Sequence, residues 1–292
     1  MKIVLFGKGG QLGWEFQRTL PILGDIRAFG REQVDFCDLD AIQKTLKEWT
    51  PNLIINASAY TDVDGAENEP AAAMKINALA PGIIAEMARH LGAVLIHYST
   101  DYVFDGQRNS PYKESDPTNP LNVYGKSKLL GEENIQQAGD AYLILRTSWV
   151  YSLRGNSFVN KVLRWARTNS LLRIVDDQIG NPTWARMLAE TTNLLLHQNS
   201  MNLYEMIRER RGVYHLAGYG YTSRYEWAKK ILSNDPEPSE QAVKTLQPAS
   251  SEEFSTSAIR PLFSALDCSH FERTFGLRLP SWEDSLKLAM SR

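Results

Sequence analysis

The sequence predicts an α/β protein whose core is a doubly wound parallel sheet, followed by a second, smaller lobe. Short apolar segments alternate with helical patterns through the first 150 residues, which is the order expected for parallel strands joined by right-handed crossover helices. The first apolar segment leads directly into a glycine-rich turn. Beyond residue 150 the alternation breaks down among short helices and loop-forming segments.

The first strand, turn and helix form one unit at the N-terminus. Residues 2–6 are an apolar run typical of a buried parallel strand, and residues 14–20 have an amphipathic pattern. Between them, Gly7, Gly10 and Gly13 are spaced for a tight turn, a close approach of backbone to a pyrophosphate, and close helix packing. A glycine triplet alone often marks only a turn, but its position directly after a strand favours a Rossmann-type dinucleotide site.

The later elements follow the same alternation. Asp40 is the expected N-cap of a helix over residues 41–49, and Gly92 is the expected C-cap of a long helix over residues 71–91. Further strands are predicted over residues 26–29, 53–57, 93–99, 141–146 and 213–216, and a further helix over residues 122–137. Together these segments give a six-stranded sheet.

Residues 151–292 contain loop signals where a continuing sheet pattern would be expected. The polar stretch at 233–241 and the serine-rich stretch at 250–257 are two of these. We expect residues 1–150 to form the dinucleotide-binding domain and residues 151–292 to form mainly a substrate-binding lobe, with a segment near 213–232 returning to the first domain. The arginines at 208–211 could bind phosphate, but a solvated surface is the better interpretation.

Composition is that of a soluble enzyme and excludes several other classes. The chain has 292 residues, 43% of them hydrophobic, and a formal net charge of −2, which offers no basic surface for nucleic acid. No apolar run approaches the roughly 18 residues of a membrane span, and the N-terminus enters a strand, so we expect a cytoplasmic protein without membrane contact. Cys37 and Cys268 are expected to be reduced thiols, and the histidines form no ligand pair, so no metal site is predicted.

Tyr124 and Lys128 are the strongest candidates for chemistry. Residues four apart on a helix share one face, and an ammonium within about 4–6 Å of a phenol favours the phenolate, lowering a pKa that is normally about 10. That effect suits proton exchange with a carbonyl oxygen. In isolation the Tyr-x-x-x-Lys spacing can mark a solvated helix face, so its weight depends on the dinucleotide motif in the same chain.

Further candidates follow the predicted strands, at the edge where ligands bind in an open parallel sheet. Thr100 follows the strand over residues 93–99, and its hydroxyl could hydrogen-bond the carbonyl oxygen that Tyr124 protonates. Residues 56–61 end another strand with small side chains that let a cofactor lie against the backbone. Asn77, inside the long predicted helix, could bridge to the sheet or pack in the core.

The chain closely resembles the extended short-chain dehydrogenase/reductase family, and within it the dTDP-4-dehydrorhamnose reductases. The resemblance covers nearly the whole chain. It rests on Gly-Lys-Gly-Gly-Gln-Leu-Gly at 7–13, Ala-Tyr-Thr-Asp-Val-Asp at 59–64 with Ala-Glu at 66–67, His-Tyr-Ser-Thr-Asp-Tyr-Val-Phe at 97–104, Pro-Leu-Asn-Val-Tyr-Gly at 120–125, Arg-Thr-Ser-Trp-Val-Tyr at 146–151, Gln-Ile-Gly-Asn-Pro-Thr at 178–183 and Arg-Pro at 260–261.

The resemblance implies a role for each matching residue. Tyr124 is the implied proton donor, Lys128 lowers its pKa and holds the nicotinamide ribose, and Thr100 completes the catalytic triad. Asp101 and Trp149 are implied to contact the nucleotide sugar, as are Thr100 and Tyr124. The implied cofactor-binding residues are Gly7, Gly10, Gln11, Leu12 and Gly13 at the pyrophosphate, Asp38 and Leu39 at the adenine, and Ala59, Tyr60, Thr61 and Tyr98 along the remaining wall, together with Tyr124 and Lys128.

The implied reaction is NADPH-dependent reduction of the 4-keto group of dTDP-4-dehydro-6-deoxy-L-mannose to dTDP-L-rhamnose, the last step in making this precursor of bacterial surface polysaccharide. The nicotinamide supplies the hydride, while the protein positions the ketone and donates the proton. Arg31 follows the second predicted strand, and a guanidinium there suits a 2′-phosphate. We therefore predict NADPH over NADH, although the resemblance permits both.

One departure from the family concerns a metal ion. Some members are dimers bridged by Mg²⁺ through glutamates, of which Glu15 is present here. The position matching a second glutamate is Arg186, whose cation would repel the metal. The sequence therefore predicts no metal, and it leaves both a monomer and a homodimer open.

Three other functions compete with this prediction. Related dehydratases carry a carboxylate where this chain has Tyr102, which disfavours dehydratase chemistry. The regulatory subunit of methionine adenosyltransferase is similar to this family and acts by binding a partner, but the presence of Thr100, Tyr124 and Lys128 favours an enzyme. A reductase of another 4-keto nucleotide sugar stays open, because such a sugar can differ by one hydroxyl.

Overall fold

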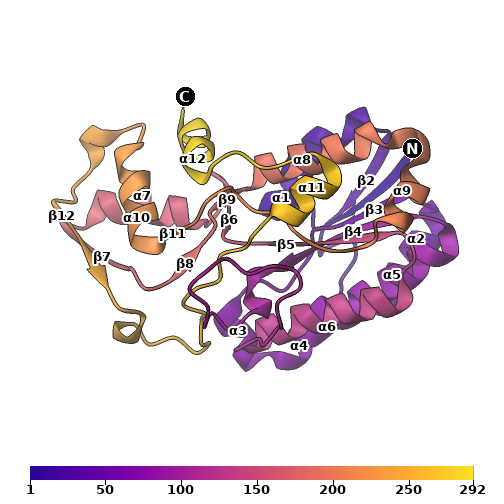
Figure 1. Cartoon of the computed structure of the whole chain (residues 1–292), viewed down its shortest axis with the longest axis horizontal. Helices are drawn as coiled ribbons and strands as arrows, with labels where there is room; N and C mark the ends of the chain where they lie inside the picture. Colours follow the sequence, from indigo (N-terminus) through magenta and orange to yellow (C-terminus); the bar gives the residue numbers. More distant parts are fainter. Residues whose placement is uncertain (292) are drawn as a thin grey trace.

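A six-stranded parallel sheet forms the centre of the molecule (Figure 1). The computed structural model describes residues 1–291. The strand order β10-β5-β4-β3-β1-β2 confirms the predicted doubly wound fold, because the chain builds the sheet outward from β1 in both directions. The strands are β1 (Lys2–Phe6), β2 (Asp25–Phe29), β3 (Leu53–Asn56), β4 (Val94–Thr100), β5 (Tyr142–Thr147) and β10 (Gly212–His215), each within one residue of its predicted ends.

Helices cover both faces of this sheet, and β1 shows how the sequence allows it. Its Ile3 and Leu5 pack in the apolar core on one face, whereas Val4 and Phe6 pack in the core on the other. The first face is covered by α1 (Gln11–Thr19), α8 (Ala185–Gln198), α9 (Leu203–Glu209) and α11 (Ser269–Phe275), and the second by α2 (Leu39–Trp49), α5 (Ala80–Leu91) and α6 (Val123–Ala138).

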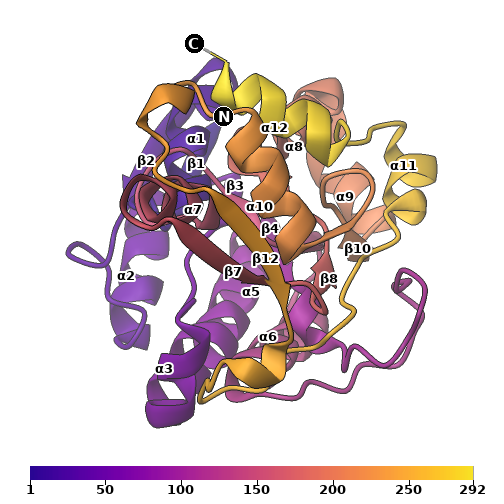
Figure 2. The ribbon, with the colours of Figure 1, turned by 90° about the vertical axis from the view of Figure 1, so that its left-hand side faces the viewer.

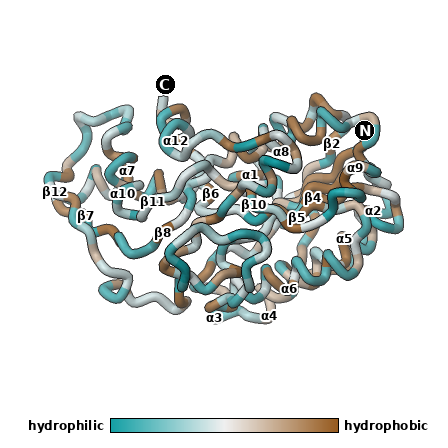
Figure 3. The backbone as a smooth tube through the Cα atoms, in the orientation of Figure 1, coloured by the Kyte–Doolittle hydropathy of each residue, from teal (hydrophilic) through white to brown (hydrophobic). Residues whose placement is uncertain are grey.

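The strands at the middle of the sheet have no solvated face. Every residue of β3 and β4 is buried, and Figure 3 shows hydrophobic residues gathered in the region of the sheet around β4 and β5. Continuous burial is the expected pattern for parallel strands that are covered on both sides. Polar side chains in these strands therefore need partners inside the protein, which is important for the residues at their carboxyl ends.

The glycine turn joins β1 to α1 within a few residues. Gly7 has a φ of 88°, and a Cβ on Gly13 would lie 2.0 Å from the Gly7 carbonyl oxygen, so both positions require glycine. α1 begins at Gln11, three residues before the predicted start. The N-terminus of the helix is thereby brought against the end of β1.

The predicted N-cap of α2 is wrong. The side chain of Asp38, and not that of Asp40, accepts the hydrogen bond from the backbone N–H of Ala41, at 3.1 Å. Asp38 has extended backbone angles, and the helix starts at Leu39. Asp40 lies in the first turn, where its charge still suits the positive end of the helix dipole.

The long helix predicted over residues 71–91 is three segments. After α3 (Val63–Asn68) come α4 (Pro70–Met74), a π-helical turn η2 (Lys75–Leu79) and then α5. Asn77 lies in the π-helical turn and is buried. Gly92 ends α5 with a φ of 63°, which confirms it as the C-cap.

A second lobe lies beyond the sheet, at the left of Figure 1, and Figure 2 views it from that side. Tyr151, Val162, Trp227 and Leu286 belong to its apolar core. Its helices are α7 (Phe158–Thr168), α10 (Arg224–Ser233) and α12 (Trp282–Met290), and its strand pairs are β7 (Leu171–Val175) with β12 (Thr245–Ala249), β6 (Val150–Tyr151) with β9 (Thr183–Trp184), and β8 (Ile179–Gly180) with β11 (Thr222–Ser223).

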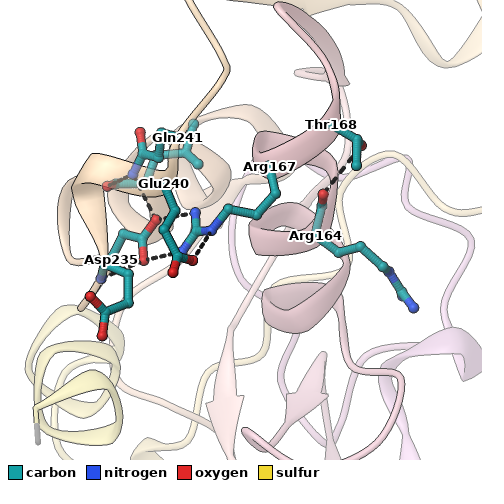
Figure 4. A network of polar contacts seen from close by, with 8 residues as sticks. Arg164, Arg167, Thr168, Asp235, Glu240 and Gln241 are labelled. Atoms are coloured by element: carbon teal, nitrogen blue, oxygen red, sulfur yellow. Dashed lines mark hydrogen bonds and ion pairs between the residues drawn. The ribbon is translucent and has the colours of Figure 1, made fainter.

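Arg167 fastens α7 to the segment that follows α10 (Figure 4). Its guanidinium donates to both carboxylate oxygens of Asp235, at 2.5 and 2.7 Å, and to Glu240 at 3.0 Å. Gln241 donates to the same Asp235 carboxylate at 2.8 Å. A bidentate pair of this kind holds one geometry, so it fixes the outer end of the lobe.

The division of the chain into two domains at residue 150 stays a prediction. The apolar cores of the structure differ from that division in two respects. α8 and α9, which follow residue 150, contribute Leu188 and Ile207 to the core of the central sheet. Within the segment 213–232, β10 pairs with β5 as expected, whereas Trp227 and Ile231 of α10 pack in the core of the second lobe. Only the first part of that segment therefore returns to the sheet.

The remaining elements are single turns. They are η1 (Leu20–Ile22), η3 (Asp101–Val103), η4 (Ser200–Asn202), η5 (Pro238–Glu240) and η6 (Ser251–Glu253). Among residues 1–291, no helix has the length and apolar character needed to cross a membrane.

Gly131→Ala is expected to destabilise the protein, although alanine normally favours a helix. A Cβ at this position of α6 would lie 2.1 Å from the backbone oxygen of Asn77, so the helix would be pushed from the π-helical turn. We expect the free energy of unfolding in urea to fall by about 1–3 kcal/mol, the usual cost of overpacking. Gly9→Ala is the control, because no atom lies within 4 Å of its added Cβ; equal losses in both variants would contradict this account.

Candidate active site

Thr100, Tyr124 and Lys128 come together at the carboxyl end of β4. Thr100 is the last residue of β4, and its side chain lies close enough to the phenol of Tyr124 on α6 to influence the pKa of that phenol. Lys128 follows one turn later on α6, with its side chain 2% exposed and directed at β4. The structure thus brings the three predicted catalytic residues to one place, at the edge of the sheet where the glycine turn also lies.

Local contacts explain why α6 begins where it does. Asn122 is the N-cap, accepting from the backbone N–H of Gly125 at 2.8 Å, and its amide also donates to the carbonyl of Ile259 at 2.8 Å. A Cβ on Gly125 would lie 2.2 Å from the carbonyl oxygen of Tyr102. The first turn of α6 therefore lies against η3, which places Tyr124 beside Tyr102 with ring centroids 5.9 Å apart.

The predicted lowering of the Tyr124 pKa is wrong for this structure. Burial raises the pKa of the phenol above its ordinary value, and the nearby side chain of Thr100 opposes this only in part. The Lys128 ammonium donates instead to the carbonyl of Tyr98 at 2.6 Å and lies 3.3 Å from Nε2 of His97. Burial in turn lowers the pKa of Lys128 to about 8, against the attraction of Glu132.

Asp101 lies behind Thr100 and accepts hydrogen bonds from three hydroxyl groups. Its Oδ1 accepts from Thr100 at 3.1 Å, and its Oδ2 accepts from Ser148 at 2.9 Å and from Ser264 at 2.5 Å. The carboxyl is 3% exposed, and burial raises its pKa. Because the Thr100 hydrogen is given to Asp101, the Thr100 oxygen is left to accept from Tyr124.

A buried ion pair that was not among our predictions from the sequence adjoins this site. Glu132, one turn beyond Lys128 on α6, pairs with Arg146 of β5 through bonds of 2.9 and 2.7 Å and accepts from Ser99 of β4 at 2.5 Å. Glu132 is fully buried and Arg146 is 4% exposed. A sequence signal did exist, because Tyr124, Lys128 and Glu132 are spaced by four on one face of the helix.

The N-terminus of α1 is suited to bind a pyrophosphate. Its N-cap is Gly10, and no side chain caps the first turn, so the helix N–H groups around Gln11, Leu12 and Gly13 are not used by a cap. Gln11 donates from Nε2 to the carbonyl of Val150 at 3.3 Å, which ties the turn to the second lobe. These residues fit the phosphates of a dinucleotide.

Residues after β3 line the same edge. Asn77 bridges to them: its Oδ1 accepts from the N–H of Tyr60 at 2.9 Å, and its Nδ2 donates to the Tyr60 carbonyl at 3.0 Å and to Ser127 of α6 at 3.0 Å. Asn77 is thus both buried and a bridge, but the bridge joins the segment after β3 to α6 and does not bond a strand of the sheet. Ala59, Tyr60 and Thr61 are held in position by this amide.

The other predicted cofactor residues lie in three different parts of the structure. Asp38 and Leu39 start α2, with Asp38 exposed. Arg31 is exposed just beyond β2, beside an ion pair of 3.1 Å between Lys8 and Glu32. The Tyr98 side chain lies in the core, where it bonds Thr192 of α8 at 2.7 Å, and only its backbone faces Lys128.

A cleft of about 1330 Å³ lies between the second lobe and the loops at 105–109 and 251–263, and its lining includes Arg224 and Arg260. Both arginines lie close enough to Tyr102 to influence the pKa of its phenol, and the Tyr102 ring in turn contacts Tyr124. Burial lowers the pKa of Arg224 to about 10. The cleft is therefore connected to the proton-transfer residues through Tyr102.

Trp149 lies against Arg224, which lines the cleft. Its ring stacks on Trp227 at 5.6 Å, the guanidinium of Arg224 lies 3.6 Å from its centroid, and its φ is 44°. A positive φ is strained for an aromatic residue. The stack with Arg224 was not foreseen, because these residues are far apart in the sequence.

Glu15 and Arg186 face one another across α1 and α8. Arg186 Nε lies 3.3 Å from Glu15 Oε2, and Glu190 lies close enough for the charge of Arg186 to act on its pKa. Over residues 1–291 no three His, Cys, Asp or Glu side chains gather in a way that could hold a metal ion.

Comparison with known proteins gives consistent matches over nearly the whole length. The model of the family described as RmlD substrate binding domain matches residues 1–292. The chain is 38% identical to the dTDP-4-dehydrorhamnose reductase of Burkholderia thailandensis, over 99% of this chain and 98% of that protein. It is 39% identical to the Escherichia coli K12 enzyme of the same name, over 98% of this chain and 96% of that protein.

Solved structures agree with these matches. The dTDP-4-dehydrorhamnose reductase of Bacillus anthracis, solved in complex with NADP, superposes with a TM-score of 0.89 at 35% identity, covering 98% of this chain and 97% of that one. A UDP-glucose 4-epimerase of Thermus thermophilus, solved with NAD, has a TM-score of 0.78 at 16% identity, covering 99% and 98%. The second similarity shows the fold alone.

Asp101→Asn is expected to destabilise the protein even though the shape is kept. Ser148 and Ser264 both donate to Oδ2, and an amide NH₂ in that place would oppose two donors with a donor. We expect a loss of about 1–3 kcal/mol in the free energy of unfolding at neutral pH, measured in urea. The exposed Asp25→Asn is the control; a loss no larger than in that control would contradict the described role of the carboxylate.

Proposed function

The chain belongs to the RmlD substrate binding domain family, and from this membership and its site we propose that it reduces a 4-keto nucleotide sugar with NADPH. The substrate is dTDP-4-dehydro-6-deoxy-L-mannose and the product is dTDP-L-rhamnose. The observation that carries the proposal is the meeting of Thr100, Tyr124 and Lys128 at the end of β4, in a chain so similar to named reductases.

Bound NADPH supplies the hydride for the carbonyl carbon. Tyr124 supplies the proton for the carbonyl oxygen. Because burial raises its pKa, the phenol is protonated at neutral pH and ready to donate. The phenolate left behind is disfavoured by the same burial, so it needs the positive charge of Lys128 on the same face of α6.

Thr100 and Asp101 orient the phenol. The Thr100 hydrogen is donated to Asp101, so the Thr100 oxygen is available to accept from Tyr124 and to fix the direction of its hydroxyl. In this arrangement Asp101 acts through Thr100, since both of its carboxylate oxygens already accept from hydroxyl groups. Asp101 is only 3% exposed, so little of the carboxyl is open to the predicted direct contact with the sugar.

The cleft beside Tyr102 has the charge that a nucleoside diphosphate sugar requires. Arg224 and Arg260 line it, and planar guanidinium groups bind phosphate oxygens in pairs. Arg260 is held by Asp64 at 2.6 Å, which leaves its position well defined. We propose that the pyrophosphate lies between these two arginines, with the sugar directed at Tyr124 and Trp149.

The remaining parts of the proposal concern the state of the protein. We propose a cytoplasmic enzyme that acts as a monomer or a homodimer, without a bridging metal. The ion pair of Glu15 with Arg186 supports the last point, because one oxygen of the Glu15 carboxylate already pairs with a cation.

The direct test is to incubate the purified protein with NADPH and the dTDP-4-keto sugar, follow the loss of nicotinamide absorbance, and identify the product. Formation of dTDP-L-rhamnose supports the proposal, and a different sugar would indicate a reductase of another 4-keto nucleotide sugar. No turnover, with cofactor still bound, would favour a binding subunit.

Tyr124→Phe is expected to reduce kcat by at least about 100-fold while NADPH still binds, because it removes the donated proton and keeps the ring. Cofactor affinity is measured by nicotinamide fluorescence. Tyr204→Phe is the matched control, since its hydroxyl bonds Asp140 at 2.9 Å, away from this site. Retained turnover in Tyr124→Phe would remove the phenol from the mechanism.

Arg31→Ala is expected to lower kcat/KM for NADPH about tenfold and to leave that for NADH nearly unchanged. The exposed guanidinium at the end of β2 would otherwise pair with the 2′-phosphate. Arg27→Ala is the control, because Arg27 lies on β2 itself with its guanidinium over Trp49 at 4.1 Å. An unchanged preference for NADPH after Arg31→Ala would refute the role of this residue.

A further inference from the structure

His97 and Asn56 contact Lys128 from within the sheet, and the proposed function gives them no role. His97 of β4 is fully buried, with Nε2 3.3 Å from Nζ of Lys128. On the other side of the ring, Nδ1 of His97 lies 3.0 Å from Nδ2 of Asn56, the last residue of β3. The three side chains form one line from β3 through β4 to α6.

A backbone group fixes the orientation of the Asn56 amide. The N–H of Ser58 donates to Oδ1 of Asn56 at 3.1 Å, and a backbone N–H can only donate, so this atom must be the oxygen. The amide nitrogen therefore faces His97. Since an amide NH₂ can only donate as well, Nδ1 of His97 must be the acceptor and carries no proton.

The remaining proton of His97 is then directed at Lys128. Burial holds the pKa of His97 well below its ordinary value, so the ring is neutral and its single proton lies on Nε2. A lysine ammonium has three N–H donors and no acceptor, so it would oppose a donor with a donor across 3.3 Å. A neutral amine offers a lone pair to the same N–H.

We propose that Asn56 and His97 are positioning residues that weaken proton binding by Lys128 and thereby set the alkaline limit of the reaction. The inference rests on the proposed function, in which Lys128 acts as a cation. Activity would be lost as the pH rises through the pKa of Lys128, and a lower pKa places that loss at a lower pH.

No other group around Lys128 opposes its protonation in the way that the His97 N–H does. On α6, Tyr124 is neutral, and Glu132 attracts the ammonium but is already bonded to Arg146 of β5 and Ser99 of β4. The Tyr98 carbonyl accepts from Nζ in either protonation state, because an amine also carries N–H groups. Burial disfavours the charged form in general, and among these neighbours the His97 N–H is the group that opposes it by its direction.

His215 provides an internal reference for the tautomer. It is also fully buried, but its Nδ1 lies 3.0 Å from the carbonyl oxygen of Tyr112, which can only accept. Its proton therefore lies on Nδ1. The two buried histidines should show opposite ring-nitrogen patterns in ¹⁵N spectra, after substitution of the other three has removed their signals.

The first experiment measures the protonation of His97 and Lys128 in the whole protein without substrate. We expect ¹⁵N spectra to show His97 with its proton on Nε2, and the ¹³Cε signal of Lys128, assigned by its absence in Lys128→Met, to titrate at about pH 8 or below. A proton on Nδ1 of His97 would overturn the proposal. Because neither measurement needs substrate, both remain valid if the reductase assay fails.

The second experiment replaces the Asn56 amide with a carboxylate, so that an acceptor takes the place of the donor that faces His97. In Asn56→Asp an acceptor faces Nδ1, so the His97 proton moves there and Nε2 accepts from the ammonium. We expect the alkaline limb of kcat/KM to move up by at least one pH unit. Asn52→Asp is the matched control, because it adds the same charge at the other end of β3 and keeps the acceptor for the Lys2 N–H. An alkaline limb that stays in place in Asn56→Asp, or that moves equally in the control, would overturn the proposal.

Discussion

The site depends on the burial of two opposite charges on one face of α6. Lys128 and Glu132 are both withdrawn from water, and a buried charge is stable only where partners surround it. The partners come from the strands: the carbonyl of Tyr98 for Lys128, and Arg146 with Ser99 for Glu132. These bonds permit one rotation of the helix about its axis, and that rotation directs Tyr124 at Thr100.

Much of this arrangement could be predicted from the sequence, because it follows from local periodicity. The apolar segments gave the strands to within one residue, and the spacing of Tyr124 and Lys128 gave their common face. The predictions that were wrong concern places where the local sequence is compatible with more than one structure. Asp38 and Asp40 can both cap a helix, and the chain conformation before α2 decides between them. The π-helical turn at 75–79 leaves the apolar pattern almost unchanged, so periodicity did not reveal it.

The electrostatics of the site could not be predicted, because they depend on contacts between distant segments. The phenol of Tyr124 was expected to have a lowered pKa from its neighbour on the helix, but desolvation by the surrounding chain acts in the opposite direction. Arg146 and Ser148 belong to a motif, but the sequence does not show that their partners are Glu132 and Asp101, and Ser264 comes from a segment with no motif. The roles of the individual residues stay predictions, whereas the family and fold are established.

The parallel pairing of β7 with β12 has a consequence for how the chain folds as it is synthesised. Between these two strands the chain leaves the second lobe, adds α8, α9 and β10 to the central sheet, and returns. During synthesis on the ribosome, all six strands of the central sheet therefore emerge before β12. Until β12 is made, β7 has no strand to pair with. Both β12 and α11, which covers part of one face of the sheet, come only with the last fifth of the chain.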